Sequence, residues 1–318
     1  MKKIKFSKIR DVNDLARSFG CSKDDFKIIE SPSEAVSHYS RMLIPKKNRK
    51  NAGSYRVVYK VLNPKLRLLQ KNISTALEYA CFFPEYVQGF VRGRSIATNA
   101  RHHLAKKCIL NLDIKDFFES ISQDRVIRVF EHIGCNSEIA SILAKVCTIN
   151  GYLPQGTSSS PIIANLVCKD MDEELNSLAM SYSINYSRYA DDITFSGDAC
   201  PQREEIEVIL GRNNFRMNNE KFVMMKRGQN QYVTGLTVFD AESPRVPRKI
   251  KKQLRLILYY SKKYGIEDHL ERIFADKVGC PYKKEFEKRK IEGWIGFLCS
   301  VEPPLGYKLK EQWLEIVK

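Results

Sequence analysis

The chain has 318 residues, of which 43% are apolar and 28% charged, and this ordinary globular composition excludes an intrinsically disordered tail. Its 53 basic and 37 acidic side chains give a net charge of +16, and its apolar runs are far shorter than the roughly 18 residues that a membrane helix needs. No apolar core follows the basic start and the nine cysteines include no CxxC pair, so we expect a cytoplasmic protein without a secretory signal, zinc site or disulfides, its thiols reduced and mostly buried.

The charge is distributed unevenly along the chain. Residues 1–110 carry a net charge of +15, residues 111–240 one of −6, and residues 241–318 one of +7. Two stretches, 41–60 and 245–264, contain basic residues and no acidic ones. Basic ends around an acidic middle fit a protein whose ends hold a polyanion, with nucleic acid as the first candidate, and whose middle holds cations. For either basic stretch alone, a solvated surface without a partner is an equally good interpretation.

The pattern of apolar residues predicts strands and helices through the first three quarters of the chain. Strands are indicated by β-branched and aromatic residues, and helices by apolar residues three and four apart. Ser137 is the predicted N-cap of its helix. In chain order we predict a strand at 54–62, a helix at 65–79, a strand at 108–114, helices at 137–148 and 161–180, a hairpin at 184–196 and a strand at 232–238.

The chain becomes helical from about Arg248, with Gly265 as the predicted C-cap of the first helix. We expect the apolar stripe of this helix to pack on a later helix that carries Trp294 and Phe297. The stripe consists of Ile250, Leu254, Ile257, Leu258 and Ser261, and the later helices are predicted at 286–301 and 308–317. The sequence therefore predicts an α+β body followed by a small helical domain.

Three acidic residues lie where predicted strands end. Asp191 and Asp192 occupy the tip of the predicted hairpin, and Asp113 ends the strand at 108–114. A pair of aspartates on a surface turn is by itself far more often an ordinary solvated turn. An acid at the end of a buried strand, however, is costly unless it is paired or binds a metal. Together the three carboxylates could hold two Mg²⁺ ions roughly 3.5–4 Å apart, the arrangement used for nucleotidyl transfer.

Three stretches resemble the successive palm motifs of reverse transcriptases in their order and spacing. They are NLDIKDFFESI at 111–121, LPQGTSSSPIIANL at 153–166 and YADDITFSG at 189–197. Three shorter stretches are similar to patterns of the retron subgroup, namely NARHH at 99–103, VTG at 233–235 and GWIGFL at 293–298. The resemblance covers residues 40–302, and the first 40 residues carry no motif. In one departure, Thr157 and Ser158 stand where many relatives carry Ala-Pro, so the turn there could have a different geometry.

The resemblance implies an α+β right-hand polymerase with fingers, a palm whose antiparallel sheet carries helices on one face, and a small helical thumb. The implied domains are an N-terminal region and fingers at 1–110, a palm with a fingers insertion at 111–240, and a helical thumb at 241–318.

The resemblance also implies the roles of individual residues. The implied catalytic residues and ligands of two Mg²⁺ ions are Asp113, Asp191 and Asp192, with the carbonyl of Ile114 as a further metal ligand. The implied dNTP-binding residues are Arg56, Phe118, Gln155, Gly156 and Lys221, and the implied RNA-binding residues are Asn99, His103, Lys249, Lys252 and Arg255. Phe118 would be the steric gate against ribonucleotides, and Lys221 a general acid for the leaving pyrophosphate. A core position for Phe118, a solvated turn for Lys221 and a structural His103 remain open alternatives.

The function implied is that of a retron RNA-directed DNA polymerase. Such an enzyme would copy part of a structured non-coding RNA, prime from an RNA 2′-OH to give branched RNA–DNA, and act in anti-phage defence with an effector protein. The alternatives are a reverse transcriptase of the group II intron or diversity-generating type, a viral-type RNA polymerase, and a non-catalytic RNA-binding scaffold. Phe118 argues against the RNA polymerase, because that class tends to place an acidic residue there. The scaffold would not need three carboxylates.

Overall fold

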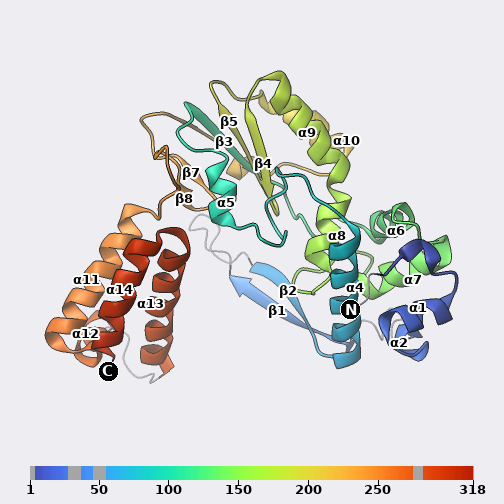
Figure 1. The fold of residues 1–318 in the computed structure, drawn as a ribbon, viewed down its shortest axis with the longest axis horizontal. Coiled ribbons are helices and arrows are strands. Elements are labelled where there is room, and N and C mark those ends of the chain that lie inside the picture. The colour runs from blue at the N-terminus through green and yellow to red at the C-terminus, as the bar shows by residue number, and fades with distance from the viewer. Residues whose placement is uncertain (1–3, 28–36, 46–54, 275–281, 318) are drawn as a thin grey trace. The chain divides into compact units, whose positions relative to one another are not determined.

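The computed structural model of the chain describes residues 4–27, 37–45, 55–274 and 282–317 (Figure 1). The chain divides into two compact units, each made of two segments. Unit 1 consists of Met1–Ser95 and Leu110–Met224, and unit 2 of Ile96–Ile109 and Met225–Lys318. The predicted fingers, palm and thumb are functional domains, whereas these two units are defined by compactness. The boundaries of the three domains therefore remain a prediction.

Unit 1 opens with short helices and a two-stranded sheet. The first elements are η1 (Phe6–Lys8), α1 (Val12–Phe19) and α2 (Asp24–Lys27). Strand β1 (Tyr39–Pro45) then pairs antiparallel with β2 (Tyr55–Val61), the strand predicted at 54–62, and this register places Ile44 opposite Arg56. Of the first basic stretch, Lys46, Lys47, Arg49 and Lys50 lie outside the described residues.

More helices follow these short elements in unit 1. Its further helices are α4 (Pro64–Ala80), α6 (Gln123–His132), α7 (Ser137–Cys147), α8 (Ser160–Val167), α9 (Lys169–Ser181) and α10 (Arg203–Arg212). The predicted N-cap of α7 is wrong by one residue, because the side chain of Asn136 accepts the backbone N–H of Ile139 at 2.9 Å. The helix predicted at 161–180 is in fact two helices, which meet at the buried Cys168 with its ψ of 0°.

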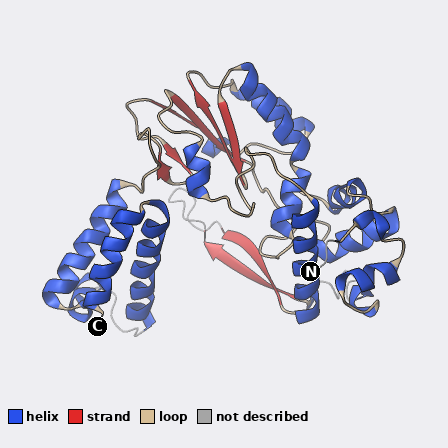
Figure 2. Ribbon diagram, viewed as in Figure 1, coloured by secondary structure: helices blue, strands red, loops and turns tan. Residues whose placement is uncertain are grey.

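A four-stranded sheet with the strand order β4-β5-β3-β6 carries two of the predicted carboxylates, Asp113 and Asp192. Its strands are β4 (Asn185–Tyr189), β5 (Asp192–Gly197), β3 (Cys108–Asp113) and β6 (Val223–Lys226). The predicted hairpin is confirmed, since β4 and β5 pair antiparallel with Tyr189 opposite Asp192. Helix α9 packs against β4 (Figure 2), where the ring of Tyr186 lies 5.2 Å from that of Phe195.

Unit 2 combines a small sheet with a helical bundle. Its elements are α5 (Ile96–Arg101), β7 (Tyr232–Val233), β8 (Leu236–Thr237), α11 (Arg248–Tyr264), α12 (Ile266–Phe274), α13 (Tyr282–Val301) and α14 (Pro303–Ile316). The strand predicted at 232–238 is interrupted, because Thr234 and Gly235 have φ values of +46° and +81° and turn the chain between β7 and β8.

The core of the bundle confirms the predicted stripe of α11 and its packing on α13, the helix that carries Trp294 and Phe297, and it adds α14 as a second partner. Leu254, Leu258 and Ser261 are buried, and Gly265 ends the helix with φ +84°. The hydrophobic cluster around them includes Ile291, Ile295, Leu298, Leu309 and Trp313. Trp313 on α14 is 3% exposed whereas Trp294 on α13 is 37% exposed, so α14 contributes the buried tryptophan of the bundle.

Two predictions about the whole chain can be compared with the described residues. Within them, no helix is both long enough and apolar enough to cross a membrane. No disulfide joins the cysteines in this part of the chain, and burial raises the pKa of the Cys147 and Cys168 thiols to about 12.

Candidate active site

The three predicted carboxylates converge on one end of the four-stranded sheet. Asp113 ends β3 and is 3% exposed, while Asp192 begins the neighbouring strand β5. The backbone N–H of Ile114 donates to the carbonyl of Asp191 at 2.9 Å, which joins the end of β3 to the hairpin. The chemistry is thus assembled from two segments that lie almost 80 residues apart in the chain.

Asp191 lies in the two-residue loop between β4 and β5, and Asp192 follows directly after it. Tyr189 pairs with Asp192, so Ala190 and Asp191 form the whole connection between β4 and β5. Ala190 has a φ of +59°, a left-handed conformation that residues other than glycine rarely adopt and that carries a strain of about 1–3 kcal/mol. We call residues 190–192 the acidic turn.

The carboxylates repel one another strongly. Burial and the negative charge of Asp113 raise the pKa of Asp191. Desolvation of the carboxylate by the surrounding protein, followed by the charges of Asp191 and Asp113, raises the pKa of Asp192 to about 7, although the residue as a whole keeps contact with solvent. A concentration of negative charge that the protein itself leaves partly uncompensated is typical of a site that binds a cation or undergoes proton transfer.

Lys221 supplies a positive charge within this acidic group. It lies in η2 (Asn219–Lys221), is half-exposed, and bonds the Asp113 carboxylate through its ammonium group. Burial opposes its charge, but Asp113 and the other two aspartates outweigh that effect and raise the pKa of Lys221. Asn218 donates to the other Asp113 oxygen at 3.1 Å. The structure therefore places Lys221 beside the carboxylates and not on an isolated solvated turn.

An open cleft of about 1330 Å³ lies over these groups. Its lining includes Arg56, Asp113, Phe118, Gln155, Asp191 and Lys221, which are six of the residues predicted for catalysis and dNTP binding. Asp192 does not line the cleft, but it is near enough to Arg56 that this arginine lowers its pKa against the acidic neighbours.

The two adjacent phenylalanines of the first motif have different surroundings. Phe117 is 4% exposed and stacks on Phe215 with 6.0 Å between ring centroids, as a core residue does. Phe118 is only partly buried, lines the cleft, and lies 6.2 Å from the ring of Phe90. Its position in the cleft favours the steric-gate interpretation over a core position.

Gly156 holds the second motif close to strand β2. It has a φ of +106°, and a Cβ there would lie 2.6 Å from the carbonyl oxygen of Tyr59. The Gln155 carbonyl accepts the Tyr59 N–H at 2.8 Å, so the loop is bonded to β2 where Gln155 faces the cleft. Thr157, at the departure from the family pattern, shares a hydrogen bond of 2.7 Å with Ser160.

Asn99 and His103 do not lie on a surface that RNA could reach in this structure. They are 1% and 0% exposed, and burial, together with the charges of His102 and Lys106, lowers the pKa of His103 to about 3. Asn99 donates to the Thr234 hydroxyl at 3.5 Å, which links the NARHH and VTG motifs inside unit 2. The burial disagrees with direct RNA contact by these two residues and favours the structural alternative.

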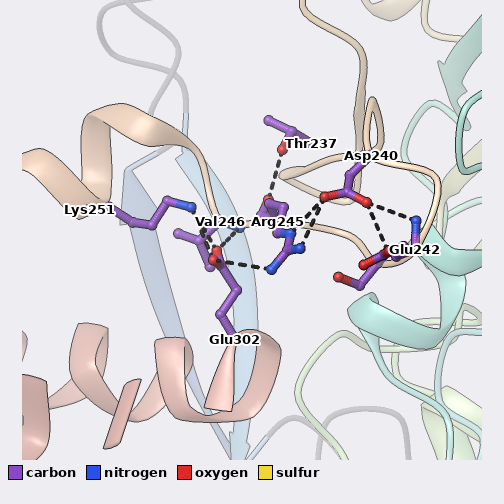
Figure 3. Close-up of polar contacts among 8 residues, drawn as sticks. Thr237, Asp240, Glu242, Arg245, Val246, Lys251 and Glu302 are labelled. Atoms are coloured by element: carbon purple, nitrogen blue, oxygen red, sulfur yellow. Dashed lines mark hydrogen bonds and ion pairs between the residues drawn. The ribbon is translucent and has the colours of Figure 1, made fainter. Parts of the chain in front are cut away.

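Some basic side chains of the stretch at 245–264 form ion pairs with acidic residues, and others are exposed. Figure 3 shows the carboxylate of Glu302 beside Lys251 and Arg245. The Lys251 Nζ lies 3.0 Å from Glu302, and Arg245 lies 3.1 Å from Asp240. Glu302 further accepts the backbone N–H of Val246 at 2.8 Å. By contrast, the predicted RNA-binding residues Lys249, Lys252 and Arg255 are all exposed on α11. The stretch is thus not uniform, and only part of it is available to a polyanion.

Two residues near the acidic turn were not singled out from the sequence. Arg188, fully buried on β4, bonds the carbonyl of Ala190, and Phe90 lines the cleft with a φ of +60°. Arg188 carried one signal, since a charged residue in an apolar strand three positions before Asp191 needs a partner. Phe90 lies in a loop without a recognisable pattern, and only the folded chain brings it to Phe118.

The donor groups of the site fit divalent metal ions. Carboxylate oxygens are the hard ligands that Mg²⁺ prefers, and a bound cation would relieve the repulsion that raises the pKa values of Asp191 and Asp192. Although the three aspartates lie close together, no group of three acidic, histidine or cysteine side chains among the described residues is already arranged to coordinate a metal ion. Lys221 instead bonds one oxygen of Asp113. A metal ion would therefore compete with this lysine.

Comparison with known proteins identifies the family. The family described as reverse transcriptase (RNA-dependent DNA polymerase) matches residues 44–252. The chain is 31% identical to the retron Ec86 reverse transcriptase of Escherichia coli over 67% of this chain and 62% of that protein. It is 33% identical to the retron Mx65 enzyme of Myxococcus xanthus over 72% and 58%, and 25% identical to the retron Ec83 enzyme of Escherichia coli over 92% and 91%. The chain thus spans about 60% of the length of the first two relatives.

A solved structure of telomerase from Candida albicans, in complex with a fragment of telomeric RNA, aligns with a TM-score of 0.44 at 11% identity. The alignment covers 88% of this chain and 63% of the telomerase chain. The predicted α+β right-hand polymerase fold is confirmed by the family match together with the observed sheets and helical bundle.

Proposed function

Because the chain belongs to the reverse transcriptase family, we propose that it is an RNA-directed DNA polymerase of retron type. The observation that carries this proposal is the convergence of Asp113, Asp191 and Asp192 at one end of the sheet, where Asp113 and Asp191 line a cleft of about 1330 Å³. The substrates are dNTPs and an RNA template. A group II intron-like or other non-retron bacterial reverse transcriptase is the alternative.

The three aspartates, with the Ile114 carbonyl, are the groups that would hold two Mg²⁺ ions. When bound, these ions would lower the pKa of the attacking hydroxyl and stabilise the leaving pyrophosphate. In this proposal Lys221 neutralises charge on the pyrophosphate and donates a proton to it, and support comes from its ion pair with Asp113 and from the carboxylates that raise its pKa and keep it protonated.

The walls of the cleft suit a deoxynucleotide. Arg56 on β2 brings a positive charge to the side of Asp192, where a triphosphate would need one. Phe118 presents a partly exposed ring to the cleft, and such a ring would clash with a ribose 2′-OH. Gln155 reaches the cleft from a loop that is bonded to β2, and Gly156 allows that close approach.

RNA binding is assigned to the uncompensated charges of α11. Lys249, Lys252 and Arg255 are exposed on one helix, with no acidic residue in the surrounding stretch from 245 to 264. A groove of about 500 Å³ between α11 and α14 places Arg255 and Lys308 near the ring of Tyr259, together with Lys262, which pairs with Glu315 at 3.2 Å. Basic side chains around an exposed aromatic ring suit phosphates and an unpaired base.

The retron assignment adds finer proposals. The template is part of a structured non-coding RNA, synthesis starts from an RNA 2′-OH to give branched RNA–DNA, and the product acts in the cytoplasm in anti-phage defence, with an effector protein as a further partner. Support comes from the retron names of the relatives and from the NARHH, VTG and GWIGFL motifs.

The catalytic assignment is tested with Asp191→Asn and Asp192→Asn. We expect each variant to lose primer extension on an RNA template with dNTPs and Mg²⁺, while a gel shift shows unchanged RNA binding, because the acids hold metal and the basic face of α11 holds RNA. Extension near the wild-type rate by either variant would remove that aspartate from the catalytic group.

The retron type is tested by sequencing the nucleic acid that co-purifies with the protein expressed from its native locus. A single structured RNA joined to DNA through a 2′–5′ branch, which a debranching nuclease separates, is the expected result. Unbranched DNA primed from a 3′-OH would favour the non-retron alternative.

A further inference from the structure

A fully buried ion pair lies directly behind the acidic turn. Arg188 on β4 and Asp172 on α9 are 0% and 1% exposed, and two bonds of 2.7 and 2.6 Å join the guanidinium Nε and Nη2 to the two carboxylate oxygens. Burying two charges is expensive, and a well-packed pair of apolar residues is often as stable as a buried ion pair. Stability alone therefore does not explain why this pair is here.

The remaining nitrogen of the guanidinium is directed at the turn. Arg188 Nη1 donates to the carbonyl of Ala190 at 3.1 Å and to the side-chain oxygen of Asn165 at 3.0 Å. The two bonds to the Asp172 carboxylate fix the plane of the guanidinium. Because the group is planar, this also fixes the direction in which Nη1 points. A lysine could not hold both carboxylate oxygens and the turn at once.

The loop that precedes α5 contacts the acidic turn from a second side, through Gly89. Asn165 donates to the carbonyl of Gly89 at 2.9 Å, and Gly89 donates to the carbonyl of Arg188 at 3.2 Å. A Cβ on Gly89 would lie 2.3 Å from the backbone nitrogen of Ala190, so the two backbones are in direct contact. All of these groups belong to unit 1.

The turn needs such support for two reasons. Ala190 is held at a φ of +59°, a conformation that costs a residue other than glycine about 1–3 kcal/mol. Asp191 and Asp192 also repel each other and Asp113, so the acidic turn would relax to separate the charges if its backbone were free. The bonds to the Ala190 carbonyl on one side and to the Asp191 carbonyl on the other resist that relaxation.

We propose that Arg188 is a positioning residue, which holds the acidic turn in its metal-binding geometry through the Ala190 carbonyl. Asp172 and Asn165 orient its guanidinium. Arg188 touches neither substrate nor metal, and it acts by keeping the carboxylates together before a cation arrives. The inference rests on the proposed function, because it concerns the readiness of that site to bind Mg²⁺.

The test compares Arg188→Lys with Leu143→Ala. Leu143 is fully buried on α7, so its truncation destabilises unit 1 without touching the turn. For each protein we would measure the Mg²⁺ concentration that gives half of the maximal rise in melting temperature, and the same midpoint in primer extension. We expect Arg188→Lys to raise both midpoints about tenfold, since a charge-assisted hydrogen bond to the turn is removed. Leu143→Ala should lower the melting temperature and leave both midpoints unchanged.

The outcomes separate the inference from the proposed function. Wild-type protein that shows neither Mg²⁺ stabilisation nor extension would overturn the proposed function itself. Normal wild-type behaviour with unshifted midpoints in folded Arg188→Lys would overturn only the positioning role.

A double variant, Arg188→Met with Asp172→Leu, removes both charges and serves if the single variant does not fold. A raised midpoint in the folded double variant supports the inference. An unshifted midpoint, or failure of both variants to fold, makes the pair purely structural and overturns it.

Discussion

Replacing Asp192 by asparagine should make the metal-free protein more stable while it abolishes catalysis. The pKa of Asp192 is about 7 in the fold, compared with about 3.9 in an unfolded chain. As the pH rises above 4 the unfolded chain loses this proton first, so the free energy of unfolding falls until the pH passes 7. The fall amounts to at most about 4 kcal/mol for a fully buried group. Because Asp192 is exposed, solvent screening reduces it to about 1–2 kcal/mol.

The assay is thermal unfolding in EDTA at pH 5 and pH 8, where asparagine removes the charge but keeps the shape of the side chain. We expect Asp192→Asn to melt about 2–8 °C above the wild type at pH 8, and by a smaller margin at pH 5, where less of the charge has developed. Adding Mg²⁺ should stabilise the wild type and reduce the difference, because a bound cation relieves the same repulsion.

A matched control is Asp170→Asn, which removes an exposed carboxylate from the first turn of α9. There the charge interacts favourably with the helix dipole, so its removal should lower stability slightly, by about 0.3–1 kcal/mol. The reasoning is refuted if Asp192→Asn melts at or below the wild-type temperature at pH 8 in EDTA, or if its advantage is the same at both pH values.

Three further predictions follow from single sites. Phe118→Ala should admit ribonucleotides, measured as the ratio of dNTP to NTP incorporation, and an unchanged ratio would return Phe118 to a core role. Gly156→Ala should lower the free energy of unfolding by about 2–4 kcal/mol through its clash with β2, whereas Gly151→Ala, at φ +79° with open space around it, should lose only about 1 kcal/mol. Glu302→Gln should destabilise unit 2 by about 1–3 kcal/mol in denaturant titrations, whereas Lys262→Gln, which breaks an exposed pair, should be nearly neutral.

Neutralising Lys249, Lys252 and Arg255 together should weaken RNA binding and flatten its dependence on salt. Removing a single basic side chain from a phosphate lowers the salt slope by about one unit. A control with the same change in charge replaces Lys8, Lys71 and Lys145, which are exposed in unit 1. Both triple variants should keep their melting temperatures, because solvated charges contribute little to stability. Equal salt slopes for the two would show that the α11 face is only solvated.

Short-range information in the sequence was enough for much of the fold. The strands at β2 and β3, the hairpin of β4 and β5 and the apolar face of α11 all follow from patterns within about ten residues. Such patterns predict structure because a strand or helix buries one continuous face, and the spacing of its apolar residues reflects that face. The break at Cys168 was missed because cysteine is not a strong helix breaker. The turn at Thr234 and Gly235 was missed although Gly235, with its φ of +81°, is a typical turn residue.

The acidic residues were identifiable because charge in an apolar strand or on a tight turn needs a reason, and the motif order supplied one. What the sequence could not decide is which charges are compensated and which side chains are buried. Lys251 and Lys252 are neighbours in the chain, yet only Lys251 meets Glu302, which lies some 50 residues away. His103 and Arg188 are likewise inside the protein for reasons found in distant segments. Burial and ion pairing depend on what the rest of the chain brings to a residue, so only the tertiary structure could assign them.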